Sequence, residues 1–207
     1  MTTVEQVLDA AVTEGYLTPL AASEGPAHSA GFLGFENFHV TDEDVAVDLG
    51  AGGGLPGLVL ATLTPCRWVL VERSERKSTF LKWAVRKLGL EDQVEVELAD
   101  AVDVGRSGLR GLASLVTARG FAPPSATAEC AAPLLAEQGV LVVSEPPKNR
   151  GNRWSNEGLS TLGLQIADSW ANECTVDSSK YQAIIRIEPC RERFPRRFPR
   201  QLAEPIF

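Results

Sequence analysis

The first 66 residues of this chain contain no lysine and no arginine, although they contain nine acidic residues. All 20 basic residues follow, where they are mixed with the remaining 18 of the 27 acids. The net charge of the whole chain is −7, and an acidic protein is a poor non-specific binder of nucleic acid. A site for a polyanion must therefore be local and lie in the later part of the sequence.

Cysteine and histidine are scarce as well, with four and two residues in a chain of 207. The cysteines are far apart and form no C-x-x-C pair, so the sequence indicates neither a disulfide framework nor a zinc site, and we expect no bound metal. No apolar segment approaches the roughly 20 residues that span a bilayer. Residues 1–10 lack the basic end and apolar centre of a secretory signal. We therefore expect a cytoplasmic protein with reduced thiols and no membrane partner.

What the chain does contain is a cluster of glycines behind a short apolar segment. Alternating apolar residues predict a strand over Val45–Leu49, and an apolar run predicts a helix over Leu58–Leu63. Four of the five residues between Gly50 and Gly54 are glycine. Glycine adopts backbone angles that other residues avoid, and it lets a ligand lie directly against the main chain. A strand, a glycine turn and a helix form the opening unit of a doubly wound α/β sheet.

The glycine turn does not by itself decide which ligand it binds. The spacing D-x-G-x-G-x-G, from Asp48 to Gly54, is typical of S-adenosylmethionine (SAM) methyltransferases, whereas G-x-G-x-x-G, from Gly52 to Gly57, is typical of dinucleotide-binding proteins. Asp48 favours SAM, because an acid at the strand end is suited to ordering the turn or to meeting the ammonium group of that ligand. The dinucleotide spacing begins too late after the strand for the turn to face a pyrophosphate. A connection that binds nothing is the third interpretation.

An acid ends the next predicted strand, Arg67–Glu72. Glu72 lies about 24 residues after Asp48, close to the spacing at which a carboxylate meets ribose hydroxyls in such folds. It also lies at the carboxyl end of its strand, where open α/β sheets bind their ligands. The alternative is a salt bridge to Arg73 or Arg76 of the following helix.

A second acid follows the third predicted strand, Val94–Leu98. Ala99 and Asp100 come directly after it, and the carboxylate is well placed to accept a hydrogen bond from the amino group of an adenine. Asp100 could instead serve only to form a turn.

The remaining pattern predicts one domain, since 207 residues suit a single α/β domain with a short extension. We assign residues 1–40 to a short N-terminal helical cap, 41–190 to the α/β domain and 191–207 to a C-terminal arm packed on it, and we expect a monomer. The further predicted elements are a helix ending near Gly15, a helix from Ser74 to Gly89, a strand over Leu112–Ala118, a helix from Pro123 to Leu135, a strand over Gly139–Val143, and final elements over Leu159–Trp170 and Tyr181–Ile187. Pro19–Gly34 gives no clear pattern.

The C-terminal arm differs in composition from the rest of the chain. Its arginines include Arg196, Arg197 and Arg200, and phenylalanine and proline stand between them. Guanidinium groups with interleaved aromatic rings suit phosphate pairing and base stacking. An extended arm that packs its phenylalanines on the sheet and exposes its arginines explains the same pattern.

Several separated segments resemble one family, the small-subunit ribosomal RNA guanine-N7 methyltransferases, also called the glucose-inhibited division protein B family. The resemblance covers roughly residues 45–200. The segments that carry it are the glycine loop Gly50–Gly57 with its L-P-G ending, Glu72 with the S-x-R-K-x-x-F-L pattern of Ser74–Leu81, the Ala99–Asp100 pair, the A-R-G-F-A segment Ala118–Ala122, and the twice-repeated R-F-P-R of the arm.

This resemblance implies a class I SAM-dependent methyltransferase fold, an α/β fold with a mostly parallel seven-stranded sheet and an antiparallel last strand. It implies ribosomal RNA or the small ribosomal subunit as the partner. The cofactor residues that it implies are Gly50, Ala51, Gly52, Gly54, Leu55, Glu72, Ala99, Asp100 and Arg119. The substrate residues that it implies are Arg119, Arg196, Arg197 and Arg200, and no catalytic base is identified.

The chain also departs from the family. The N-terminal helical portion is shorter than usual and has no basic residues, and Ser144–Pro147 reads S-E-P-P where the family tends to have a lysine-glycine step. Glu145 would repel phosphate, although Lys148 follows closely. A methyltransferase acting on a small molecule, or a SAM-binding protein without turnover, are therefore the competing interpretations. Arg119 would contact cofactor or substrate, or form a structural ion pair with Asp100 or Glu145.

Overall fold

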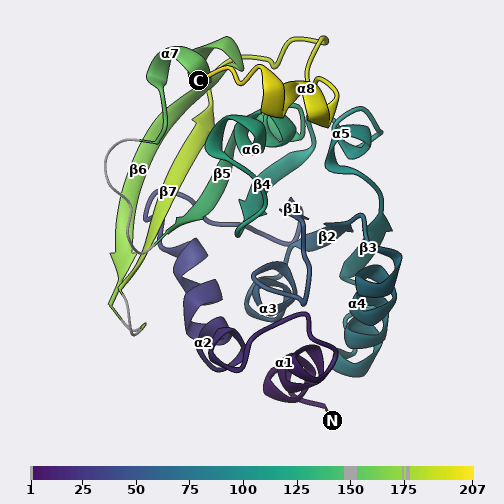
Figure 1. The fold of residues 1–207 in the computed structure, drawn as a ribbon. Helices are drawn as coiled ribbons and strands as arrows, with labels where there is room; N and C mark the ends of the chain where they lie inside the picture. Colours follow the sequence, from purple (N-terminus) through teal and green to yellow (C-terminus); the bar gives the residue numbers. More distant parts are fainter. Residues whose placement is uncertain (1, 147–152, 174, 176–177) are drawn as a thin grey trace.

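A seven-stranded sheet forms the centre of the protein in the computed structural model, which describes residues 2–146, 153–173, 175 and 178–207 (Figure 1). The order of the strands across the sheet is β3-β2-β1-β4-β5-β7-β6. The strands are β1 (Val45–Leu49), β2 (Arg67–Glu72), β3 (Val94–Leu98), β4 (Ala113–Ala118), β5 (Leu135–Glu145), β6 (Leu164–Asn172) and β7 (Ser179–Arg186). The pairs from β3 to β5 are parallel, and β7 is antiparallel to both of its neighbours. The predicted mostly parallel sheet with an antiparallel last strand is confirmed.

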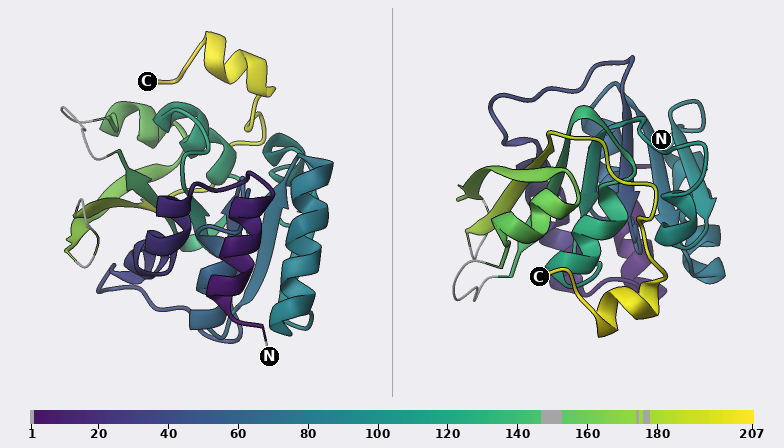
Figure 2. Two further views of the ribbon diagram at one scale, coloured as in Figure 1. Left: turned by 60° about the horizontal axis from the view of Figure 1, so that its bottom comes forward. Right: turned by 90° about the horizontal axis from the view of Figure 1, so that it is seen from above.

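Helices cover both faces of this sheet. Alternate residues of each central strand point to opposite faces, so that Val47 and Leu49 enter one apolar cluster and Ala46 the other. The helices are α1 (Val4–Thr13), α2 (Pro19–Ala30), α3 (Gly57–Leu63), α4 (Glu75–Leu88), α5 (Ala101–Val104), α6 (Pro124–Ala131), α7 (Asn156–Thr161) and α8 (Phe198–Ala203), with a 3₁₀ turn η1 (Gly31–Leu33). In the left view of Figure 2, α1, α2 and α4 lie side by side on one face, and α5, α6 and α7 supply the other cluster.

Local signals fix several of the helix ends. Thr3 and Gln6 form a reciprocal capping box at the start of α1. Ser74 caps α4, and Gly89 ends that helix in a left-handed conformation at φ 69°. The predicted helix from Ser74 to Gly89 is therefore confirmed.

Three segments differ from what the pattern predicted. Pro19–Gly34, which gave no clear pattern, forms α2 and η1. The helix opened by Pro124 ends at Ala131 and not at Leu135, because Pro133 lacks the N–H group that would continue it, and Leu135 already belongs to β5. The segment Leu159–Trp170 divides into α7 and β6 at Gly163, whose φ of 76° breaks the chain direction.

The N-terminal segment is tied to the far edge of the sheet. The indole N–H of Trp170 donates to the carbonyl oxygen of Gly31 at 2.8 Å, and the Tyr181 hydroxyl donates to that of His28 at 2.6 Å. The side-chain amide of Asn172 donates to the carbonyl oxygen of Ala27 at 2.9 Å. These bonds hold the end of α2 against the β6–β7 hairpin.

The C-terminal arm is held on the opposite face by its main chain. Arg110 donates to the carbonyl oxygens of Cys190 and Phe194 at 3.1 and 2.9 Å, and Arg106 donates to that of Pro195 at 2.7 Å. Phe194 is buried among the residues of α5 and α6. Within the described part of the chain, no helix has the length and apolar character that crossing a membrane requires.

Candidate functional site

The loop that follows β1 turns through three glycines in left-handed conformations. The φ angles of Gly50, Gly52 and Gly54 are 73°, 56° and 101°. The N–H groups of Gly50 and Ala51 donate to the carbonyl oxygen of Val71 at 2.9 and 3.0 Å, which anchors the loop to β2. A Cβ atom added at Gly52 would have only the Gly50 carbonyl oxygen within 4 Å, at 3.6 Å. The loop therefore leaves free space against its main chain, where a ligand can approach.

Asp48 holds this loop and the start of α3 against the sheet. It is fully buried; one carboxylate oxygen accepts a hydrogen bond from the N–H of Gly57 at 2.9 Å, and the other accepts one from the hydroxyl of Thr117 at 2.8 Å. Gly57 leaves no room for a side chain, because an added Cβ would lie 2.6 Å from that of Asp48. Burial raises the pKa of Asp48 to about 6. Of the two roles that the sequence suggested, its contacts show the ordering of the turn.

Glu72 joins the glycine loop to the start of α4. Its carboxylate accepts hydrogen bonds from the N–H groups of Gly52 at 3.0 Å and Ser74 at 2.8 Å. Among the described residues it forms no ion pair with Arg73 or Arg76, so the alternative drawn from the sequence is not seen. The carboxylate is thus fixed in position at the carboxyl end of β2.

A pocket of about 210 Å³ lies beside these residues at the carboxyl ends of the strands. Of the residues predicted to hold a cofactor, the pocket is lined by Gly50, Glu72, Ala99 and Asp100. It is not lined by the other predicted residues, Ala51, Gly52, Gly54, Leu55 and Arg119. The lining residues that the sequence reasoning missed are Val71, Arg73, Lys77, Ala101, Gly120, Phe121 and Phe198. The structure therefore gathers acids from two strand ends around one cavity and adds two aromatic rings.

The two aromatic rings come from distant segments of the chain. Phe121 follows β4, and a Cβ added at Gly50 would lie 2.9 Å from its ring. The ring of Phe198, from the C-terminal arm, meets that of Phe121 edge to face at 6.1 Å between centroids. Phe121 belongs to the same A-R-G-F-A segment as Arg119, but of this segment only Arg119 was predicted as a site residue. The sequence suggested base stacking for the phenylalanines of the arm, whereas the place of Phe198 in this pocket depends on the tertiary fold.

Asp100 begins the short helix α5. One carboxylate oxygen accepts a hydrogen bond from the N–H of Val102 at 2.9 Å, so the turn-forming role is observed. The same residue lines the pocket, next to Ala99. A capping carboxylate has further lone pairs, and a hydrogen bond to a ligand is compatible with this contact.

Arg119 directly follows β4 and is not among the residues that line this pocket. Neither of the ion pairs that we considered, to Asp100 or to Glu145, forms among the described residues. Burial lowers the pKa of Arg119, while the nearby Tyr181, Asp48 and Glu24 act to raise it. Asp48, the anchor of the glycine loop, is one of the charges that act on this pKa, and the guanidinium forms no ion pair among the described residues.

Glu145, which the sequence placed where it would repel phosphate, has its negative charge paired with a neighbouring arginine. Its carboxylate lies 2.8 Å from Arg153 in a salt bridge and accepts a hydrogen bond from the indole N–H of Trp154 at 2.6 Å. Its side chain is only 8% exposed. Pro147, the last residue of this departure, and Lys148 lie outside the described residues.

The three arginines predicted to contact substrate do not share one environment. Arg196 forms a bidentate salt bridge with Glu129, at 2.9 Å from Nε and 2.6 Å from Nη2, and its main-chain N–H donates to the same carboxylate at 2.7 Å. The Glu129 side chain is fully buried, so this contact gives Arg196 a structural role, and its substrate contact stays a prediction. Arg197 and Arg200 are exposed.

A family model and several curated proteins match this chain. The family model described as rRNA small subunit methyltransferase G matches residues 33–150. The ribosomal RNA small subunit methyltransferase G of Lactobacillus acidophilus is 33% identical over 161 residues, which are 76% of this chain and 66% of that protein. The protein of the same name from Kineococcus radiotolerans is 46% identical over 99 residues, 46% of this chain and 37% of that protein. The chain thus spans less than two thirds of the length of each relative.

Solved structures share the architecture at low sequence identity. The [4+2]-cyclase SpnF superposes with a TM-score of 0.64 at 13% identity, over 91% of this chain and 97% of that protein. An RNA methyltransferase from Salinibacter ruber, in complex with S-adenosyl-L-homocysteine, superposes with a TM-score of 0.55 at 17% identity, over 79% and 93% of the two chains. Likeness at this level establishes the fold, and fold does not decide the reaction.

Proposed function

The chain belongs to the rRNA small subunit methyltransferase G family, and we propose that it transfers a methyl group from SAM to N7 of a guanine in small-subunit ribosomal RNA. The observation that carries the proposal is the pocket in which Glu72 and Asp100, from neighbouring strand ends, face the space beside the glycine loop. A ribosomal RNA substrate places the proposed reaction in the cytoplasm.

The residues of the pocket fit this cofactor. Glu72 would accept hydrogen bonds from the ribose hydroxyls, and Asp100 would accept one from the adenine amino group. The open space at Gly52 would admit the ligand close to the main chain, since a Cβ is absent there. SAM, when bound, supplies a methyl group on a positively charged sulfur.

The protein needs no general base for this acceptor, because guanine N7 carries a free lone pair and no proton. Its task is to hold the nucleophile in line with the methyl group and to exclude water. Arg119, which directly follows β4 at the carboxyl ends of the strands, would donate to the O6 atom of the guanine, an acceptor that arginine suits well. The exposed Arg197 and Arg200 would pair with phosphates of the RNA.

The proposal is tested with purified protein, SAM and small-subunit ribosomal RNA. Wild-type protein should bind SAM in calorimetry and introduce 7-methylguanosine into the RNA. The modified position is mapped by comparing ribosomal RNA from a deletion strain with that from its parent. Gly52→Asp should abolish both SAM binding and methyl transfer, because it places a second carboxylate beside Glu72 in the space for the ligand.

The matched control is Gly89→Asp. Gly89 has a similar left-handed conformation and open surroundings, but it ends α4 away from the pocket. Its substitution should leave SAM binding intact. Equal SAM affinity in wild type and Gly52→Asp would refute the cofactor site, and methylation of small molecules but not of RNA would favour the competing interpretation.

A further inference from the structure

A second cavity, of about 90 Å³, adjoins the cofactor pocket at the carboxyl ends of β4 and β5. The two cavities share Gly120 and Phe121 as lining residues. The wall of the second cavity also includes Glu145, Arg153 and Trp154. Of the described residues, none of those assigned to SAM or to guanine O6 lines it. Its volume is less than half that of the cofactor pocket, so it admits a group much smaller than a nucleoside.

Two charged side chains line this cavity among the described residues, and they pair with each other. One oxygen of the Glu145 carboxylate accepts a hydrogen bond from Nη1 of Arg153 at 2.8 Å. The other oxygen accepts one from the indole N–H of Trp154 at 2.6 Å. Trp154 is buried, so the carboxylate is anchored to a rigid part of the wall. The carboxylate in turn fixes the direction of the guanidinium.

Arg153 keeps donors that this pairing does not use. A guanidinium carries five N–H donors, and among the described residues the Arg153 side chain donates only the bond from Nη1. The side chain is 33% exposed, so its remaining donors can meet a ligand that comes from solvent. Adjacent guanidinium donors match the oxygen atoms of a phosphate, which they bind in pairs.

The C-terminal arm runs along both cavities. Phe198 meets the ring of Phe121, which lines both of them, and Phe207 meets the ring of Trp154 at 6.3 Å between centroids. Arg197, the neighbour of Phe198, is exposed and is a predicted phosphate contact. An RNA strand held by the arm would therefore pass close to the second cavity.

We infer that Arg153, held by Glu145, binds a backbone phosphate of the RNA next to the acceptor guanine. This inference rests on the proposed function. The chain departs from its family in the segment that contains Glu145, and an unpaired carboxylate there would repel phosphate. The ion pair cancels that repulsion, and the remaining donors of Arg153 supply the contact. The phosphate occupies the second cavity while the base reaches the methyl group in the adjoining pocket.

The test removes both charges of the pair at once. In Arg153→Gln alone, the unpaired Glu145 would itself repel RNA, whereas Glu145→Gln/Arg153→Gln keeps the net charge of wild type. The double variant should bind a short RNA that spans the mapped methylation site about tenfold more weakly, because a hydrogen bond to a charged group is lost. The slope of log K against log salt should fall by about 0.7, which corresponds to one phosphate of a single strand. The affinity for SAM should be unchanged in calorimetry.

The matched control is Arg67→Gln/Glu95→Gln. These residues also form a salt bridge between an arginine and a glutamate, but Arg67 begins β2, away from the carboxyl ends of the strands. This variant should keep the RNA affinity and the salt slope of wild type.

Melting temperatures show whether each variant is folded. Should the paired glutamines lower the melting temperature, Glu145→Gln/Arg153→Met removes the same charges, keeps an acceptor for the indole of Trp154 and needs no polar partner at position 153.

The outcomes distinguish this inference from the proposed function. Wild-type protein that methylates no guanosine of small-subunit RNA contradicts both. Methylating wild-type protein whose RNA affinity and salt slope are matched by a folded double variant overturns the role of Arg153 alone, because the ion pair is then only structural. A loss of SAM affinity with an unchanged salt slope also overturns it, since Arg153 would then serve the cofactor.

Discussion

At the scale of single residues, Asp48 links the glycine loop to the stability of the protein. Its pKa is raised from 3.8 to about 6 by burial, so the folded state binds a proton more tightly than the unfolded state. Ionisation of Asp48 therefore lowers the free energy of unfolding as pH rises from 4 to 6, and this loss of stability persists above pH 6. In Asp48→Asn the amide oxygen can accept from the N–H of Gly57, and the amide NH₂ can donate to the Thr117 hydroxyl in place of accepting from it. The variant should therefore gain about 3 kcal/mol relative to wild type between pH 4 and 7 in urea unfolding.

Asp44 provides the control for this measurement. Burial acts to raise the pKa of Asp44, but hydrogen bonds from Ser114 and Thr41 outweigh this effect and lower that pKa. The stability that it contributes is complete above its ordinary pKa and fades only at lower pH. The difference between wild type and Asp44→Asn should be flat from pH 5 to 7. A difference for Asp48→Asn that is equally flat from pH 4 to 7 would show that the carboxylate is not perturbed.

At the scale of elements, the C-terminal arm depends on the pair of Arg196 with Glu129. Loss of one partner of a buried ion pair leaves an uncompensated charge and costs about 3–5 kcal/mol. Arg196→Leu should lower the free energy of unfolding by about that amount, measured by urea denaturation. The double variant Glu129→Leu/Arg196→Leu should recover most of the loss, since apolar residues can replace such a pair.

The neighbouring arginine is the control for the arm. Arg197 is exposed and in none of the ion pairs seen among the described residues, so Arg197→Leu should change stability by about 0.5 kcal/mol or less. Similar losses in Arg196→Leu and Arg197→Leu would mean that the buried pair does not hold the arm.

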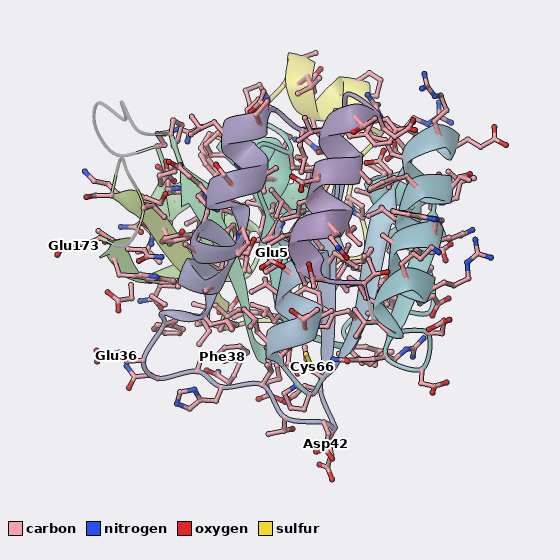
Figure 3. All side chains as sticks on the ribbon, turned by 90° about the horizontal axis from the view of Figure 1, so that it is seen from below. Glu5, Glu36, Phe38, Asp42, Cys66 and Glu173 are labelled. Atoms are coloured by element: carbon pink, nitrogen blue, oxygen red, sulfur yellow. The ribbon has the colours of Figure 1, made fainter. Side chains whose placement is uncertain are left out.

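At the scale of the whole molecule, exposed acidic side chains and the exposed arginines of the C-terminal arm lie on different parts of the surface. Figure 3 shows Glu36, Asp42 and Glu173 projecting from the rim of the face that carries α1 and α2. Arg197 and Arg200 lie on the arm whose Phe198 lines the pocket. If this arm holds RNA, affinity should fall with salt, and replacing both arginines by alanine should lower the slope of log K against log salt by about 1.5.

Two basic residues far from the carboxyl ends of the strands give the control. Arg67 begins β2 and Arg86 lies in the last turn of α4, far along both elements from the carboxyl ends of the strands. Their joint replacement by alanine should leave the salt slope nearly unchanged, as measured by titration at several salt concentrations. A lower slope in the control pair and not in the arm would place the RNA beside Arg67 and Arg86, away from the arm.

The sequence by itself determined the parts of this protein that depend on short-range chemistry. The alternation of Val45–Leu49, the cap at Ser74 and the left-handed Gly89 act within a few residues, so the strands and helices around the glycine loop followed directly. Glu72 and Asp100 were found because parallel strands end at one edge of a sheet. Pro19–Gly34 did not follow, since its pattern contains no distinct period. The boundary between α6 and β5 was placed too late, although Pro133 is a local signal that ends the helix before Leu135.

Only the tertiary structure decided how distant segments share the site. Arg196 and Arg197 are adjacent and chemically identical, and packing against Glu129 from α6 makes one structural and leaves the other exposed. Phe198 reaches the pocket through folding of the C-terminal arm onto the sheet. Burial and charge pairing depend on all neighbours in space, and a residue's local sequence does not contain them.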